Sequence, residues 1–339
     1  MTDQIFDGLK YSILDLATVC HGDTLQQTFA RSLQTARFAE AQGYTRYWFS
    51  EHHNMESVAS AATSVLIGYV AGGTATIRVG SGGIMLPNHS PLIIAEQFGT
   101  LGSLYPNRID LGLGRAPGTD GLTAMTIRSA PINAPYDFKA NIQQLQQYFS
   151  SENASSKVRA LPGEGVEVPL WVLGSSTDSA YLAAQMGLPY AFAAHFAPAQ
   201  LLEALAIYKN NFTPSAQLKE PYAMACVNVI AADTAEEAAF LSTSMYKMFL
   251  GIFTNSRAPL MPAFNVAQLA GLWTPEQEYG VKHMLSYAFI GDKPTIAKKM
   301  QHFLQKTGVQ EVMAISQIFD QQKKEHSFRL FKEVMTGQL

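Results

Sequence analysis

Arg115 follows a short apolar segment, residues 109–113, and comes directly before the turn Ala116-Pro117-Gly118. Its planar guanidinium can donate paired hydrogen bonds to phosphate oxygens, and the adjacent Gly114 lets the backbone approach a ligand closely. An apolar strand that delivers an arginine at its carboxyl end is typical of anion-binding sites in α/β proteins. The segment therefore predicts that Arg115 binds an anion.

A second polar segment, Gly174-Ser175-Ser176-Thr177-Asp178-Ser179, joins an expected strand to an expected helix. Hydroxyl groups and free backbone N–H groups at a helix N-terminus bind phosphate, aided by the helix dipole. The alternative is an ordinary N-cap, which Ser and Asp also provide. We favour a phosphate site, because Arg115 would bring a second and independent anion-binding element to the same place.

The pair His52-His53 follows an expected strand and lies beside Glu51. Adjacent side chains on an extended chain point to opposite sides, so at most one of the two histidines faces a given site. A histidine there could act as a general base or as a hydrogen-bond donor, because its pKa lies near working pH. The alternative is a polar surface turn. Zinc is not favoured, since two histidines without a positioned third ligand do not make a zinc site.

Three further features could reach the same region. His195 closes another expected strand, and His89 lies in a Pro-rich segment; each could line a substrate pocket or serve a purely structural role. The run Ser81-Gly82-Gly83 would let a flat ring lie against the backbone, and its alternative is a β-bulge or a tight turn.

The segments that must position these residues alternate between strand-like and helix-like patterns. Expected strands lie at 11–16, 44–49, 77–80, 109–113, 168–173, 188–194, 222–231 and 311–316, and helical segments separate them. This alternation without a linker predicts an α/β fold, a (β/α)₈ TIM barrel, as one domain over residues 1–339. In such barrels the chemistry lies at the carboxyl ends of the strands, where the polar segments fall.

Residues 251–275 interrupt this alternation in the C-terminal half. They show little regular pattern and contain three prolines. An irregular segment of this length inside a compact domain is a lid, a binding loop or disorder.

Composition excludes several classes of protein. The 339 residues include 24 basic and 27 acidic side chains, a net charge of −3, so no basic footprint indicates nucleic acid. Cys20 and Cys226 make neither a disulfide framework nor a metal-ligand spacing. The first residues lack the pattern of a signal peptide, and no apolar run is long enough to span a bilayer. We expect a soluble cytoplasmic protein with no metal and no membrane partner.

Taken in order, five segments resemble the bacterial-luciferase-like flavin monooxygenases, and most closely the single-subunit luciferase-like proteins. They are residues 48–54, 79–87, 96–98, 106–115 and 174–176. The resemblance covers nearly the whole chain. It implies a (β/α)₈ barrel with an insertion near the C-terminal strands, a homodimer, and reduced FMN supplied by a separate flavin reductase. It also implies that one oxygen atom of O₂ passes to a small organic substrate through a peroxyflavin.

The resemblance also implies residue roles. His52 matches the catalytic histidine of the family and His53 its more structural neighbour, and both are candidate catalytic residues. Gly82-Gly83 matches a non-prolyl cis peptide against the flavin ring, with Ser81 beside it. Arg115, Ser176 and Ser179 match flavin-phosphate ligands, Gly174 and Ser175 belong to the same loop, and Ser175 offers its backbone N–H. Residues 251–275 match a mobile lid, and Glu51, His89 and His195 are candidates for the substrate pocket.

Two positions differ from luciferase itself. Gly114 stands where luciferase has a reactive cysteine, and Ala194 where it has a tryptophan beside the flavin, so we expect neither light emission nor a long-chain aldehyde substrate. The fold also serves F420-dependent hydride-transfer enzymes, and an F420-dependent oxidoreductase is the first alternative. A flavin-binding protein without catalysis is the second.

Overall fold

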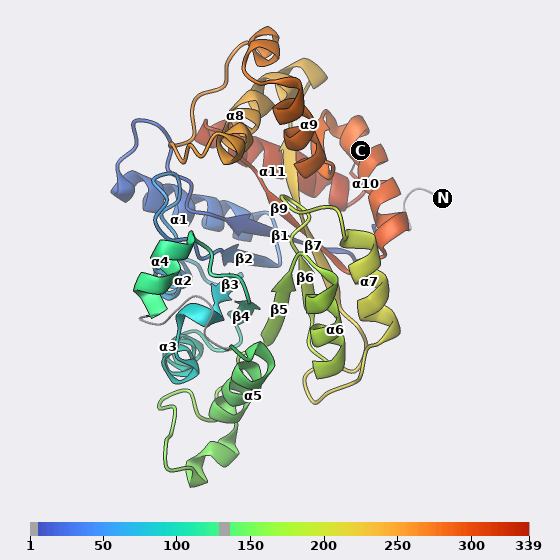
Figure 1. Ribbon diagram of the computed structural model, residues 1–339. Helices are drawn as coiled ribbons and strands as arrows, with labels where there is room; N and C mark the ends of the chain where they lie inside the picture. The colour runs from blue at the N-terminus through green and yellow to red at the C-terminus, as the bar shows by residue number, and fades with distance from the viewer. Residues whose placement is uncertain (1–5, 129–135, 339) are drawn as a thin grey trace.

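The computed structural model describes residues 6–128 and 136–338 (Figure 1). Eight parallel strands close into a barrel in the order β1-β2-β3-β4-β5-β6-β7-β9 and back to β1. This confirms the predicted (β/α)₈ TIM barrel. The strands are β1 (Lys10–Asp15), β2 (Arg46–Phe49), β3 (Arg78–Met85), β4 (Ile109–Gly114), β5 (Leu170–Gly174), β6 (Tyr190–Phe192), β7 (Ala223–Ala231) and β9 (Glu311–Ile315).

Helices surround the barrel, and amphipathic stripes along them account for their packing. They are α1 (Leu25–Ala41), α2 (Thr63–Gly72), α3 (Pro91–Leu104), α4 (Gly121–Arg128), α5 (Phe138–Phe149), α6 (Thr177–Met186), α7 (Leu201–Asn210), α8 (Ala235–Phe253), α9 (Pro275–Met284), α10 (Lys293–Thr307) and α11 (Gln321–Met335). Short 3₁₀ helices lie at Leu86–Asn88, Ser151–Ser155 and Val266–Gly271.

Alternating strand residues fill the barrel interior, as a closed sheet requires. The interior cluster packs two tryptophans edge to face, Trp48 and Trp171, with their ring centroids 5.1 Å apart. Its other buried members are Leu14, Ala191, Met224, Cys226, Met313 and Ile315. The interior is a packed core, so any ligand site must lie at one end of the barrel.

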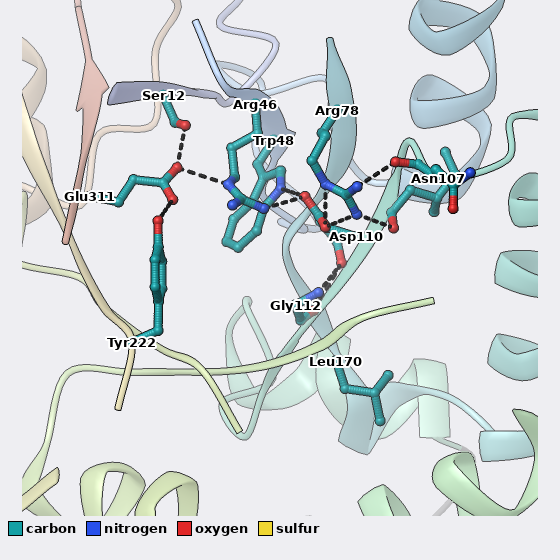
Figure 2. A network of polar contacts seen from close by, with 12 residues as sticks. Ser12, Arg46, Trp48, Arg78, Asn107, Asp110, Gly112, Leu170, Tyr222 and Glu311 are labelled. Carbon is teal, nitrogen blue, oxygen red and sulfur yellow. Dashed lines mark hydrogen bonds and ion pairs between the residues drawn. The ribbon is translucent and has the colours of Figure 1, made fainter. Parts of the chain in front are cut away.

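The amino-terminal end of the barrel is closed by a network of buried charges (Figure 2). Arg46 lies between two carboxylates, 2.8 Å from Asp110 Oδ2 and 2.8 Å from Glu311 Oε1. Arg78 binds the other oxygen of Asp110, and the Tyr222 hydroxyl donates to Glu311 at 2.7 Å. Two cations thus neutralise two anions, which is how buried charges become tolerable.

Strand β3 differs from the prediction. The expected strand stopped at residue 80, but β3 continues through the glycines to Met85, with a register shift against β4 between Ser81 and Ile84. The run Ser81-Gly82-Gly83 is therefore an irregular part of a strand and not a turn. Glycines weaken a strand signal in the sequence, which is why the pattern ended early.

Two elements were missed. Helix α4 lies in a region expected to be irregular, and β8 (Ala288–Gly291) pairs with the carboxyl half of β7 outside the closed barrel. The sequence predicts that residues 116–135 are irregular, and residues 129–135 of this segment lie outside the described residues.

The insertion lies between β7 and β9, in the C-terminal half as predicted. Helix α8 continues to Phe253 and α9 begins at Pro275, so the irregular part spans residues 254–274 and includes one 3₁₀ helix. Figure 1 shows this orange segment reaching the blue loop that follows β1, where Leu260 and Cys20 form a β-bridge. The segment therefore lies over the carboxyl ends of the barrel strands. Its mobility stays a prediction.

Candidate active site at the carboxyl ends of the strands

Arg115 and the loop after β5 meet, because β4 and β5 are neighbours in the barrel. Arg115 follows β4 directly, and its Nη2 lies 3.5 Å from Asp178 Oδ2 in the first turn of α6. Both side chains are well exposed, at 62% and 72%, so this ion pair is weak and can be exchanged for another anion. The two predicted anion-binding elements are thus brought together.

The start of α6 offers several donors. Ser176 is its N-cap residue, but its side chain makes no capping hydrogen bond, so the hydroxyl and the first N–H groups of the helix remain for a ligand. Ser179 is different, because its hydroxyl donates to the Ser176 carbonyl at 2.7 Å and meets the Tyr190 hydroxyl at 2.9 Å. Gly174 is required here, since a Cβ would lie 1.9 Å from Ser179 Oγ.

The irregular part of β3 lies between these donors and the histidines. The Gly82–Gly83 peptide bond is cis, as the resemblance implied. A Cβ at Gly82 would meet Leu14 and Trp48, so this glycine faces the top of the barrel interior. The Ser81 hydroxyl both donates to and accepts from the backbone of Gly112, at 2.9 and 3.0 Å, so only the backbone of Ser81 remains for a cofactor.

His52 and His53 point to different partners, as expected for neighbours on an extended chain. His52 Nδ1 shares a hydrogen bond of 3.0 Å with the Ser50 hydroxyl. Burial lowers the pKa of His52 to about 4, against an opposing effect of the Glu51 charge. His52 is therefore neutral near pH 7 and able to accept a proton.

His195 lies just after β6, and β6 is diametrically opposite β2 in the strand order. Asn228 of β7 fixes it by donating to its carbonyl at 2.6 Å. Burial, and secondarily the charged form of His52, lower the pKa of His195 to about 3. Its Nδ1 is buried without a hydrogen bond to any described residue. Two neutral imidazoles thus lie at this end of the barrel, and the charged form of one would affect the pKa of the other.

Glu51 is completely buried and receives His53 Nε2 at 2.8 Å and His89 Nε2 at 2.9 Å. Burial alone would raise the pKa of Glu51, but these hydrogen bonds outweigh it and lower the pKa to about 2. His53 and His89 are therefore engaged with a buried carboxylate. The prediction had placed His53 with the catalytic groups and had placed Glu51 and His89 in the substrate pocket; the geometry favours a supporting role for all three.

The segment 254–274 contacts the same end of the barrel. Arg257 Nη1 donates to the Asn54 carbonyl at 3.2 Å and lies 3.7 Å from Asp120. An open cleft of about 740 Å³ lies between these residues and those around them. Asn54 directly follows His53, so the cleft lies beside the loop that carries the histidines.

The arrangement combines an arginine, a helix N-terminus, a glycine-rich strand and neutral histidines. The donors suit a phosphate, the glycines leave room for a flat ring, and His52 can exchange a proton. Sequence reasoning missed the residues that hold these groups: Asn228, Tyr190, Met85 and Asn88. Met85 and Asn88 stood in segments already singled out, residues 79–87 and the Pro-rich segment around His89, but no sequence signal named their partners.

Among residues 6–128 and 136–338, no group of three or more His, Cys, Asp or Glu side chains is arranged to hold a metal ion. Within the same described part of the chain, no helix has the length and apolar character needed to cross a bilayer.

Comparison with known proteins agrees with this architecture. The family model described as luciferase-like monooxygenase matches residues 9–311. A luciferase-like monooxygenase of Escherichia coli strain K12 is 48% identical over 334 residues, which is 98% of each chain. The chain belongs to the luciferase-like monooxygenase family, and this membership supports an oxidoreductase.

More distant relatives carry more specific names. An N-acetyl-S-alkylcysteine monooxygenase of Bacillus subtilis is 34% identical over 68% of this chain and 70% of that protein. Among solved structures, apo-MsnO8 superposes with a TM-score of 0.89 at 31% identity, covering 96% of this chain and 98% of that one.

Two further structures show the fold alone, because their identity is low. They are the FMN complex of the oxygenating constituent of 3,6-diketocamphane monooxygenase (TM-score 0.73, 16% identity, 98% of both chains) and an F420-dependent secondary alcohol dehydrogenase (TM-score 0.67, 14% identity, 96% of this chain and 98% of that one).

Proposed function

We propose that this protein is an FMN-dependent monooxygenase that uses reduced FMN from a separate flavin reductase to oxygenate a small organic substrate. The observation that carries the proposal is the meeting of Arg115 with the N-terminus of α6, beside the glycines of β3. This donor set fits a flavin phosphate, and the FMN complex of a protein with the same fold supports the choice of cofactor.

In this proposal Arg115, Ser175, Ser176 and the first N–H groups of α6 hold the phosphate, and Gly82 and Gly83 face the ring. Ser179 positions the loop by donating a hydrogen bond to the Ser176 carbonyl, and its hydroxyl can donate to a phosphate only after this hydrogen bond breaks. Bound reduced FMN would supply the electrons that activate O₂. His52, neutral at working pH, takes up or returns a proton at the substrate side, and Ser50 fixes its ring through Nδ1.

In this proposal, residues 254–274 exclude water from the site. They are tied to the barrel end through Arg257 and through the hydrogen bonds that Leu260 makes with Val19 and His21, at 2.8 Å each. We also propose, on the resemblance, that the protein forms a homodimer.

Binding titrations test the cofactor. Purified protein should bind FMN or reduced FMN, and Arg115→Ala should lose at least about tenfold in affinity, because a charge-assisted pair to phosphate disappears. Arg159→Ala is the matched control, since Arg159 forms a partly exposed ion pair with Glu164 in the loop before β5. Equal affinity in Arg115→Ala and wild type would contradict the phosphate assignment.

The F420-dependent dehydrogenase shares the fold, so F420 is the informative competitor in these titrations. Preference for F420 over FMN would overturn the choice of cofactor. A monooxygenase should further show substrate-dependent O₂ uptake with reduced FMN and a panel of small ketones, aldehydes and sulfur compounds. Tight FMN binding with no substrate-dependent uptake across a broad panel would favour a non-catalytic flavin-binding protein.

A further inference from the structure

The Glu51 carboxylate accepts hydrogen bonds from four groups of the described residues. Its Oε1 receives His53 Nε2 at 2.8 Å, His89 Nε2 at 2.9 Å and Asn88 Nδ2 at 3.2 Å. Its Oε2 receives the backbone N–H of Met85 at 2.9 Å. Because Glu51 is 0% exposed, these bonds are not replaced by water, and loss of any one leaves a buried polar group unpaired.

These donors come from different loops. Glu51 and His53 follow β2, while Met85 ends β3, two residues beyond Gly83. Asn88 then extends the network, because its Nδ2 also donates to the Pro117 carbonyl at 2.8 Å, two residues beyond Arg115. One carboxylate therefore links the loop that carries His52, the strand that carries Gly82–Gly83 and the turn that follows Arg115.

Backbone contacts tighten the same junction. The His53 N–H donates to the Gly118 carbonyl at 3.3 Å. Gly118 has φ +65°, and a Cβ there would lie 2.6 Å from the Glu51 carbonyl oxygen. The β4 turn thus packs directly on the backbone of Glu51, so a shift of Glu51 would be transmitted to the turn beside Arg115.

The network also fixes two tautomers. An ionised carboxylate only accepts hydrogen bonds, so both imidazoles that approach Glu51 must carry their hydrogen on Nε2. His53 and His89 are thereby committed as donors. Of the adjacent pair His52-His53, His53 uses its Nε2 for Glu51, whereas His52 makes no hydrogen bond to this carboxylate.

We infer that Glu51 is a positioning residue of the active site, which aligns the loops after β2, β3 and β4 and holds His53 and His89 as Nε2–H donors. It does not touch substrate or cofactor. The inference rests on the proposed function insofar as the aligned groups bind FMN.

Glu51→Gln tests the role with almost no change of volume. Glutamine offers an NH₂ group where four donors converge, so at least one donor faces another donor. We expect FMN affinity to fall at least about tenfold, the equivalent of one lost charged hydrogen bond. Unchanged FMN affinity in a folded Glu51→Gln protein would overturn the inference.

Glu40→Gln is the matched control. Glu40 also accepts several hydrogen bonds, from the backbone N–H groups of Ala75, Thr76 and Ile77, but it lies in the last turn of α1 and holds the segment that enters β3 at the amino-terminal end of the barrel. Its variant should lower the melting temperature and leave FMN affinity within about twofold. Equal loss of affinity in both variants would reduce Glu51 to a purely structural residue.

If Glu51→Gln does not fold, two variants at His89 test the positioning role instead. His89→Gln keeps a side-chain donor and should retain more FMN affinity than His89→Leu, which removes it. Equal affinities in the two variants would contradict the positioning role.

Nitrogen NMR of the histidine rings gives a readout that needs no flavin. His53 and His89 should show the Nε2–H tautomer in the wild type, and Glu51→Gln should change it. A wild-type Nδ1–H tautomer at both positions would overturn the inference, whether or not the protein binds FMN. Absence of FMN binding with the expected tautomers would instead count against the proposed function alone.

Discussion

His52 and His53 show how environment assigns different roles to identical side chains. His53 donates to a buried carboxylate, whereas His52 meets only the hydroxyl of Ser50 among the hydrogen-bonding side chains of the described residues. Burial lowers the pKa of His52 to about 4. His52 is therefore neutral near pH 7 and not engaged with a carboxylate, so of the pair it is the candidate for proton transfer.

His52→Ala should reduce substrate-dependent O₂ uptake at least about tenfold, the low end of general acid–base contributions. FMN affinity should change little, because the phosphate site lies after β4 and β5. The measurement is a turnover assay with any substrate of the panel that the wild type oxidises, alongside a flavin titration. His302 is an exposed histidine of α10, so His302→Ala is the control. Wild-type turnover in His52→Ala would remove this residue from the mechanism.

The two lowered histidine pKa values also predict how stability depends on pH. In the folded protein, His52 stays neutral down to about pH 4 and His195 down to about pH 3. The unfolded chain takes up these protons near pH 6.5, so it binds more protons than the native state between those limits. Stability is therefore complete above about pH 6.5 and falls as the pH decreases, by up to about 3 kcal/mol for His52 alone.

Urea unfolding at about pH 7 and about pH 4.5 checks this expectation. His195→Gln removes one of the two groups, so its free energy of unfolding should fall less than that of the wild type over this interval. An identical pH dependence in variant and wild type would show that His195 is not held neutral by burial.

At the scale of elements, the barrel strands were predictable because each is a short apolar segment between helical patterns. Strand β3 was predictable only to Gly80, since the glycines that allow its irregular course carry no strand signal of their own. The short strand β8 was missed because it adds to β7 outside the barrel. The positions of Arg115, His52 and Ser176 followed from strand ends alone, whereas the Glu51 network depends on contacts between loops that no local pattern encodes.

The segment 254–274 provides a prediction at this scale. Arg257 joins it to the loop after β2 through a partly exposed hydrogen bond, and segments held by few such contacts open locally at low free energy. Arg257→Ala should therefore increase amide hydrogen exchange in residues 254–274 and leave the barrel strands unchanged. Lys282→Ala, which loses only an exposed ion pair on α9, is the control. Unchanged exchange in Arg257→Ala would show that Leu260 and its neighbours hold the segment without the arginine.

At the scale of the whole molecule, the two ends of the barrel have different roles. Arg46, Asp110 and Glu311 close the amino-terminal end with charges that pair with one another. The carboxyl end gathers the exposed arginine, the free helix N-terminus and the neutral histidines. This division is what the (β/α)₈ fold leads one to expect, and it explains why strand ends alone located the candidate site.

The outer surface carries the last prediction. Helices α2 and α3 pack together and expose Val65 (68%), Tyr69 (45%), Ile93 (45%) and Leu104 (63%). Large apolar side chains exposed on neighbouring helices are typical of a protein interface, and a twofold dimer would bury them on both chains at once. Light scattering should therefore find a dimer, and Val65→Glu should convert it to a monomer because a carboxylate would be buried beside its symmetry mate. Phe240→Glu, a similarly exposed position on α8, should leave the dimer intact. A monomeric wild type, or a Val65→Glu protein that still dimerises, would exclude this surface as the interface.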